Sequence, residues 1–196
     1  MIRPEAKLDE IVRKYEEGGA AAVSVLTEED YFDGSLDDLR TVKGSVRLPV
    51  LRKDFLFEEY QVYEAAAAGA DAVLLIVAAL EDEPLFQLRQ LAERDLGMDA
   101  LVEVHTEEEM ERASQTGATL IGINNRDLHT FEVSLETSLR LAAKASEGAV
   151  LISESGLRVT SDLKRLQAVG FSGFLIGESL MRADDPAQAL KVLISN

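Results

Sequence analysis

The stretch PVLRKDF, residues 49–55, decides the fold that we predict for this chain. It begins as an apolar strand and ends in charged residues, with Lys53 near its end. Buried parallel strands are apolar runs, so charged residues belong at their ends. In a barrel of repeated strand–helix units, active-site groups lie where strands end and loops begin. We therefore expect Lys53 at the mouth of a barrel.

One pattern recurs along the sequence: an amphipathic helix, a glycine, and then a short apolar strand. Glycine suits the end of a helix because the chain there often adopts a left-handed conformation. Spacings of about 20 to 30 residues suit parallel strands joined by crossover helices. The glycines of this pattern are Gly19, Gly44, Gly69, Gly97, Gly117, Gly148 and Gly170, and the predicted helix N-caps are Ser35, Thr106, Ser134 and Ser161.

The pattern gives seven strands and eight helices in a single domain, residues 1–196. The first helix, over residues 7–17, follows no strand. We predict an α/β fold, a TIM-type β/α barrel with seven of its eight strands visible and the first one missing. The alternative is a doubly wound open sheet, which would place a ligand at one switch point. Polar residues follow nearly every strand here, which favours the barrel.

Composition excludes several classes of function. A hydrophobic content of 46% is too high for a disordered chain, and the absence of cysteine excludes disulfides and thiol chemistry. A net charge of −16 argues against nucleic-acid binding. The sequence contains neither a signal peptide nor an apolar run that reaches the ~18 residues of a membrane helix, so we expect a cytoplasmic protein without a membrane partner.

Two charged side chains at predicted strand ends are candidates for acid–base chemistry. Burial at the barrel rim would lower the pKa of Lys53 and make it a general acid, whereas the alternative is a surface ion pair with Asp54. Successive side chains of a strand point to opposite faces of the sheet, so Glu103 should point to the face opposite that of Val102 and Val104. Glu103 would then be an acid–base group or one half of a structural ion pair. His105 is either a base or a residue that lines the rim, and His129 is assigned no role.

Three further strand ends carry polar residues. Asn124, Asn125 and Arg126 follow one strand; an amide can orient a hydroxyl and a guanidinium can bind a carboxylate, but asparagine is also common in turns. The last two strands end in residues that suit a phosphate site, since barrels often bind phosphate there and glycine lets backbone amides approach an anion. These residues are Glu154, Ser155, Gly156, Gly177 and Glu178. We find no triad partners for Ser155 and no zinc motif.

The sequence resembles the indole-3-glycerol-phosphate synthase family of tryptophan biosynthesis. The matching stretches span nearly the whole chain in the family's order. They are AAAVSVLTEEDYFDGSLDDL (20–39), LPVLRKDF (48–55), GADAVLLIVAAL (69–80), ALVEVHTEEE (100–109), IGINNRDL (121–128), ISESG (152–156) and FLIGESLMR (174–182).

The resemblance implies a lyase that closes the ring of 1-(2-carboxyphenylamino)-1-deoxyribulose 5-phosphate. The products are indole-3-glycerol phosphate, carbon dioxide and water, and no metal or organic cofactor takes part. It also implies site roles: Lys53 as general acid, Glu103 as acid–base carboxylate and Asn124 as the orienting amide. Substrate contacts are implied for Arg126, Glu154 and Ser155, and phosphate contacts for Gly156, Gly177 and the backbone of Glu178.

The resemblance also implies a departure from the family. Family members have an N-terminal extension and a first strand that supplies a second catalytic lysine and a carboxylate, and this sequence has no counterpart to them. We expect an N-terminally truncated barrel whose open strand edges allow self-association. Two alternatives remain open: an impaired barrel fragment that still binds phosphate ligands, and an enzyme like phosphoribosylanthranilate isomerase. The isomerase is disfavoured because it would be expected to use a cysteine or an aspartate pair.

Overall fold

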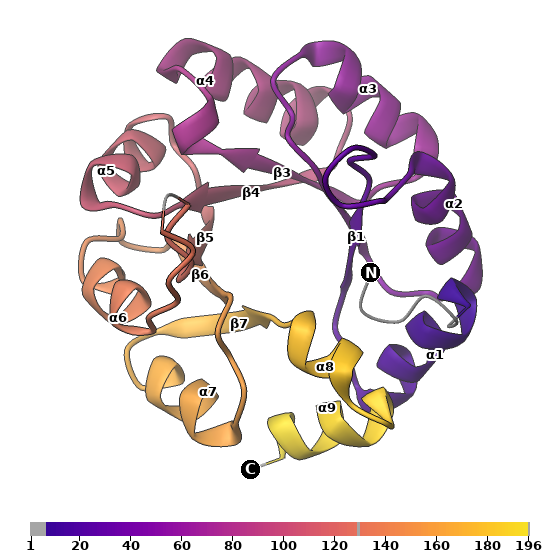
Figure 1. The fold of residues 1–196 in the computed structure, drawn as a ribbon. Coiled ribbons are helices and arrows are strands. Elements are labelled where there is room, and N and C mark those ends of the chain that lie inside the picture. Colours follow the sequence, from indigo (N-terminus) through magenta and orange to yellow (C-terminus); the bar gives the residue numbers. More distant parts are fainter. Residues whose placement is uncertain (1–6, 129, 196) are drawn as a thin grey trace.

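Seven parallel strands form one curved sheet in the computed structural model, which describes residues 7–128 and 130–195. The strands follow each other around the sheet in the order of the sequence (Figure 1). This order contains no reversal, so the doubly wound alternative is wrong. The strands are β1 (Val23–Leu26), β2 (Val50–Lys53), β3 (Ala72–Ile76), β4 (Asp99–Val104), β5 (Leu120–Asn124), β6 (Val150–Glu154) and β7 (Phe171–Leu175).

Helices surround the sheet on its outer side (Figure 1). A 3₁₀ turn at Val77–Ala79 follows β3, and a π-helical turn at Leu91–Asp95 extends the fourth helix. The described residues contain one α-helix more than the eight predicted, because a short helix precedes the last one. The helices are α1 (Leu8–Gly18), α2 (Leu36–Ser45), α3 (Glu59–Ala68), α4 (Asp82–Gln90), α5 (Glu107–Gln115), α6 (Glu136–Ala142), α7 (Thr160–Gln167), α8 (Glu178–Arg182) and α9 (Pro186–Ile194).

The glycines predicted at helix ends have the expected backbone conformation with one exception. Gly44 lies inside α2 and does not end it. The other six have positive φ angles between 67° and 102°, which L-residues with side chains rarely adopt. In the six other units, the recurring glycine therefore lies between the helix and the strand that follows it.

Two of the four predicted N-caps are confirmed by side-chain hydrogen bonds. Ser35 accepts from the Asp38 amide, and Thr106 accepts from the Glu109 amide at 3.1 Å. Ser134 lies two residues before α6, and Ser161 lies inside α7. At the start of α7 the Asp162 carboxylate accepts from the backbone amides of residues 158 and 159, which makes a serine cap unnecessary.

The sheet separates two apolar regions. The outer core packs strand side chains such as Val73, Val102 and Ile121 against the helices. The inner core contains side chains that point into the barrel, including Leu51, Leu74 and Leu101. Burial on both faces explains why the strands are nearly continuous apolar runs.

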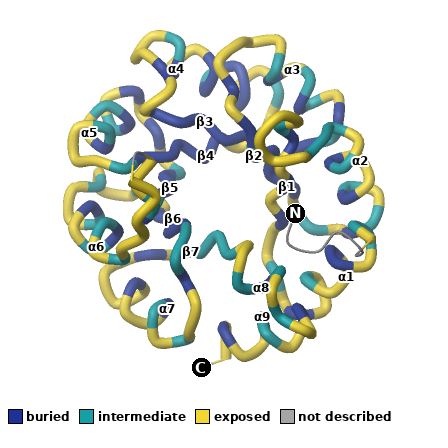
Figure 2. The backbone as a smooth tube through the Cα atoms, viewed as in Figure 1, coloured by how far each residue is buried: buried dark blue, intermediate teal, exposed yellow. Residues whose placement is uncertain are grey.

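The sheet does not close, although the helical layer does. β1 and β7 are the two edges, and strand pairing between them is absent from the described residues. Their inner positions are correspondingly more exposed than those of β3 to β5 (Figure 2); Leu26 on β1 is 40% exposed. On the outside, α9 packs against the end of α1, where a Cβ on Gly18 would lie 3.1 Å from Leu190. The gap in the sheet thus lies between β1 and β7, and the packing of α9 on α1 spans it on the outside.

Candidate functional site

One lysine and two buried carboxylates lie together at the carboxyl ends of three strands. The Nζ atom of Lys53, at the end of β2, lies 3.3 Å from Glu103 Oε2 and 3.2 Å from Glu154 Oε2. The Lys53 side chain is 22% exposed, whereas those of Glu103 and Glu154 are 3% and 1% exposed. Glu103 and Glu154 lie 50 and 101 positions after Lys53 in the sequence, and both meet it at the mouth of the barrel.

Strand alternation accounts for the direction of Glu103. Its neighbours Val102 and Val104 are fully buried in the outer core, so the intervening side chain points to the barrel interior. The alternative pairing of Lys53 with Asp54 does not occur. The buried Asp54 carboxylate accepts instead from Thr27 Oγ1 at 2.6 Å and from the Arg52 guanidinium at 2.9 Å.

The three groups control one another's ionisation. Burial alone would raise the pKa of Glu103, but the contacts with His105 and Lys53 outweigh it and lower the pKa to about 2. Burial alone would lower the pKa of Lys53, but the charges of Glu154 and Glu103 raise it above its usual value. The prediction of a lowered pKa for Lys53 is therefore wrong. Its partners are anions that favour the ammonium form.

Glu154 is the member of the cluster that titrates near neutrality. Burial, followed by the nearby negative charge of Glu103, raises its pKa to about 7, and the Lys53 charge only partly compensates. Its Oε1 atom is buried without a hydrogen-bond partner among the described residues. At neutral pH Lys53 therefore has one ionised neighbour, Glu103, and one neighbour, Glu154, that can gain or lose a proton.

The adjacent asparagines Asn124 and Asn125 face opposite sides of β5 and its loop. Asn124 Oδ1 accepts from Ser155 Oγ at 2.8 Å and from the Arg126 amide at 3.0 Å, and its amide group faces Glu103. Asn125 is buried and donates to the carbonyls of Glu154 and Ser155 at 2.9 and 3.1 Å. Asn124 therefore belongs to the cluster, while Asn125 holds the backbone of the loop after β6 through its side-chain hydrogen bonds.

Arg126 lies at the rim and does not reach the cluster. It is two residues beyond β5, where the chain turns and forms an isolated bridge with Val133. Its guanidinium lies 3.7 Å from the Glu178 carboxylate, which also pairs with Arg182 at 3.0 Å. The side chain of Glu178 is thus directed to arginines, as its predicted backbone role requires.

The glycines predicted for phosphate lie after β6 and β7. Ser155 and Gly156 have consecutive positive φ angles of 67° and 77°, and a Cβ on Gly156 would lie 2.4 Å from Val133. Gly177 precedes α8, and a Cβ there would meet no atom within 4 Å. The turn at Gly156 therefore requires glycine sterically, whereas Gly177 borders open space.

A pair of aromatic rings at the mouth was not among the predicted site residues. Phe32, in the loop after β1, stacks on Phe55, two residues after the end of β2, with a centroid distance of 5.7 Å. Both are at least 40% exposed. Aromatic residues just beyond two adjacent strand ends were the signal in the sequence that could have identified them. His129 lies outside the described residues.

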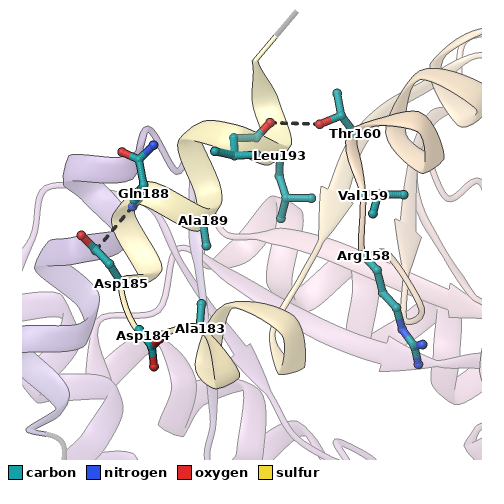
Figure 3. Close-up of a pocket in the computed structure, with 10 residues that line it drawn as sticks. Arg158, Val159, Thr160, Ala183, Asp184, Asp185, Gln188, Ala189 and Leu193 are labelled. Carbon is teal, nitrogen blue, oxygen red and sulfur yellow. Dashed lines mark hydrogen bonds between the residues drawn. The ribbon is translucent and has the colours of Figure 1, made fainter.

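A hollow lies away from this cluster, on the outside of the barrel. It has a volume of about 500 Å³ and lies between the start of α7 and the last two helices (Figure 3). Thr160 Oγ1 donates to the Val192 carbonyl across its edge at 2.9 Å. Its lining holds Arg158, Asp184 and Asp185 but none of the side chains that contact Lys53. We therefore place the candidate site at the strand ends.

The fold and the strand-end cluster define a TIM-type β/α-barrel enzyme with a candidate acid–base site of one lysine and two carboxylates. The family profile described as indole-3-glycerol phosphate synthase matches residues 1–193. The chain belongs to this family. No helix among the described residues has the length and apolar character needed to cross a membrane.

Curated relatives agree with this assignment, and a solved structure agrees with the fold. The indole-3-glycerol phosphate synthase of Carboxydothermus hydrogenoformans is 50% identical over 196 residues, which are 100% of this chain and 74% of the relative. That of Desulfosudis oleivorans is 50% identical over 97% of this chain and 73% of its own length. The structure of 3-hexulose-6-phosphate synthase from Salmonella typhimurium has a TM-score of 0.76 at 13% identity, covering 96% and 92% of the two chains, and supports the fold alone.

Proposed function

We propose that this chain catalyses the decarboxylating ring closure of 1-(2-carboxyphenylamino)-1-deoxyribulose 5-phosphate. A bond forms between the aromatic ring and the carbonyl carbon, the bond to the carboxylate breaks, and the hydroxyl leaves as water. The products are indole-3-glycerol phosphate, carbon dioxide and water. Family membership supports this reaction, and the observation that carries it is Lys53 between Glu103 and Glu154 at the strand ends.

Lys53 is the proposed general acid. Its raised pKa keeps it protonated at neutral pH, so it holds the proton that the carbonyl oxygen accepts during ring closure. Glu103, ionised and buried, is the proposed acceptor of the proton lost in the dehydration. Asn124 orients this carboxylate through its amide. The reaction as proposed uses no cofactor.

Substrate contacts are proposed around this centre. Arg126 is 38% exposed at the rim, and its one ion pair with a described residue is as long as 3.7 Å, so its guanidinium can bind the substrate carboxylate. Glu154 and Ser155, beside Lys53, are proposed to line the substrate pocket. The stacked faces of Phe32 and Phe55 suit the aromatic ring of the substrate.

The phosphate is proposed to bind at the ends of β6 and β7, through the backbone of Gly156, Gly177 and Glu178. The net charge of −16 disfavours an anion at long range. Backbone amides at short range bind phosphate without a basic surface. The open space beside Gly177 leaves room for the phosphate oxygens.

The test is turnover of this substrate, followed by the fluorescence of the indole product. The chain contains no tryptophan, so its own fluorescence interferes little. We expect indole formation that falls by about 10²-fold or more in Lys53→Ala, as for loss of a general acid. Lys144→Ala is the matched control, since Lys144 lies on the outer layer in an exposed ion pair with Glu107. Absence of product from the folded chain would contradict the proposed reaction.

A further inference from the structure

His105 lies between two carboxylates at the end of β4. Its Nε2 atom is 3.3 Å from Glu103 Oε1, an ion-pair contact, and its Nδ1 atom is hydrogen-bonded to Glu109 Oε2 at 3.2 Å. The side chain is only 10% exposed. Glu103 uses its other oxygen, Oε2, for Lys53, so its two oxygens face two different basic groups.

Both ring nitrogens of His105 lie near carboxylate oxygens: Nδ1 has hydrogen-bond geometry toward Glu109, while the buried Nε2 meets Glu103 as an ion-pair contact and has no hydrogen-bond partner among the described residues. A neutral imidazole has one N–H, and its second nitrogen would direct a lone pair at a carboxylate. A doubly protonated ring supplies a proton to each side. Burial alone would lower the pKa of His105, but Glu103 and Glu109 outweigh it and raise the pKa to about 9. The ring is therefore a cation at neutral pH.

The ring is held by the start of α5. Glu109 Oε2 accepts from the His105 backbone amide at 2.7 Å, and the Glu109 amide donates to the Thr106 cap. The same carboxylate thus fixes the backbone and the ring of His105. The charged groups that face the imidazole are Glu103 from β4 and Glu109 from α5, with Lys53 on the far side of Glu103.

We propose that His105 is a positioning residue for the reaction, whose imidazolium holds one oxygen of Glu103 and keeps this carboxylate ionised with its other oxygen toward Lys53. The inference rests on the proposed function for its catalytic consequence. The structural part of the proposal, that a charged histidine lies between two carboxylates, can be tested without measuring turnover. The two parts are therefore tested by separate measurements.

The first measurement is the ¹H NMR titration of the imidazole Cε1 protons. The chain has two histidines, so His105→Asn assigns the His105 signal by its loss. We expect a midpoint between pH 8 and 10, more than about one unit above the ordinary 6.5. Glu109→Gln is expected to lower this midpoint, whereas Glu108→Gln, an exposed position on the same turn, leaves it within a few tenths of a unit. A His105 midpoint at or below 6.5 overturns the proposal.

The second measurement is the pH dependence of turnover. His105→Asn retains a donor but cannot carry charge, so the pKa of Glu103 rises and the acid limb of kcat/KM moves to higher pH. We expect kcat at pH 7 to fall about 10-fold while KM changes less than about 2-fold. His105→Lys, which restores a cation, is expected to recover part of the loss. An unchanged acid limb in folded His105→Asn protein overturns the positioning role. If that variant does not fold, the acid limb of Glu109→Gln, in which His105 loses one of its two carboxylate partners, is measured in its place, and an unchanged acid limb there overturns the role.

Discussion

Gly122 leaves the space that the carboxylate of Glu154 occupies. A Cβ built on Gly122 would lie 2.1 Å from Glu154 Oε1, a distance that atoms without a covalent bond do not reach. Gly122 is on β5 and faces the barrel interior, like Leu120 and Asn124 on either side of it. The missing side chain therefore helps to set the position of Glu154, and through it the contact with Lys53.

Gly122→Ala is expected to reduce turnover by about 10-fold or more, because the Glu154 carboxylate must move away from Lys53. The same overlap is expected to lower the free energy of unfolding by about 1–3 kcal/mol, as for overpacking in a core. Steady-state kinetics and urea denaturation measure the two effects. Gly44→Ala is the control: its Cβ would meet no atom, and it lies in a helix where alanine is favoured by roughly 0.5–1 kcal/mol. Equal activity of the two variants would contradict this role of Gly122.

The ionisation of Glu154 gives a pH-dependent stability. Its pKa is about 7 in the folded chain and near the ordinary 4.5 when unfolded, so the folded state binds the proton more tightly. This contribution is present below pH 4.5 and is lost as the pH rises through 7. Glu154→Gln removes this dependence, so its stability relative to the parent chain should increase between pH 5 and pH 8, by at most about 3 kcal/mol. Urea denaturation at both pH values measures the difference, and a constant difference would contradict the raised pKa.

The two adjacent asparagines should respond in opposite ways to alanine. Asn125→Ala leaves the Ser155 carbonyl and the Ser138 amide without their partner and removes one of the two hydrogen bonds that the Glu154 carbonyl accepts from Asn125. We therefore expect a loss of about 2–4 kcal/mol in unfolding free energy. Asn124→Ala should reduce turnover by about 10-fold or more with a smaller loss of stability. Thermal unfolding and kinetics of both variants make the comparison, each serving as the control for the other. Similar profiles would contradict the division of roles.

The open edges of the sheet should promote self-association. Within residues 7–128 and 130–195, β1 and β7 each pair with a strand on one side alone, and an exposed edge strand is a template for pairing with another chain. We expect concentration-dependent association in sedimentation velocity. Leu26→Lys, at an exposed apolar position of β1, should weaken it, because charged residues protect edges. A monomer at all concentrations, with sharp unfolding, would contradict this prediction.

The sequence was sufficient for the β/α architecture and for placing Lys53 and Glu103 of the candidate site. Recurrent glycines located the helix ends, and the alternation around Val102 and Val104 directed Glu103 inward. Lys53 was placed at the mouth because the apolar run PVL ends just before the charges. These features depend on local backbone geometry, which neighbouring residues in the sequence determine.

The electrostatics of the site could not be predicted in the same way. Glu154 contacts Lys53 across 101 sequence positions, and the two carboxylates reverse the pKa shift that burial alone would give to the lysine. The outward turn of Arg126 depends on its bridge with Val133, which no local pattern indicates. The stacking of Phe32 on Phe55 likewise joins two loops. Each of these features depends on distances between separate strand–helix units.

The order of the strands also bears on how the chain folds. Strands that pair are consecutive in the sequence, so each pairing closes a loop of one strand–helix unit, while the packing of α9 on α1 joins distant segments. Short loops cost less entropy to close, which favours growth of the sheet one unit at a time during synthesis. Amide hydrogen exchange should accordingly be slowest in β4, at the centre of the sheet, and faster toward β1 and β7.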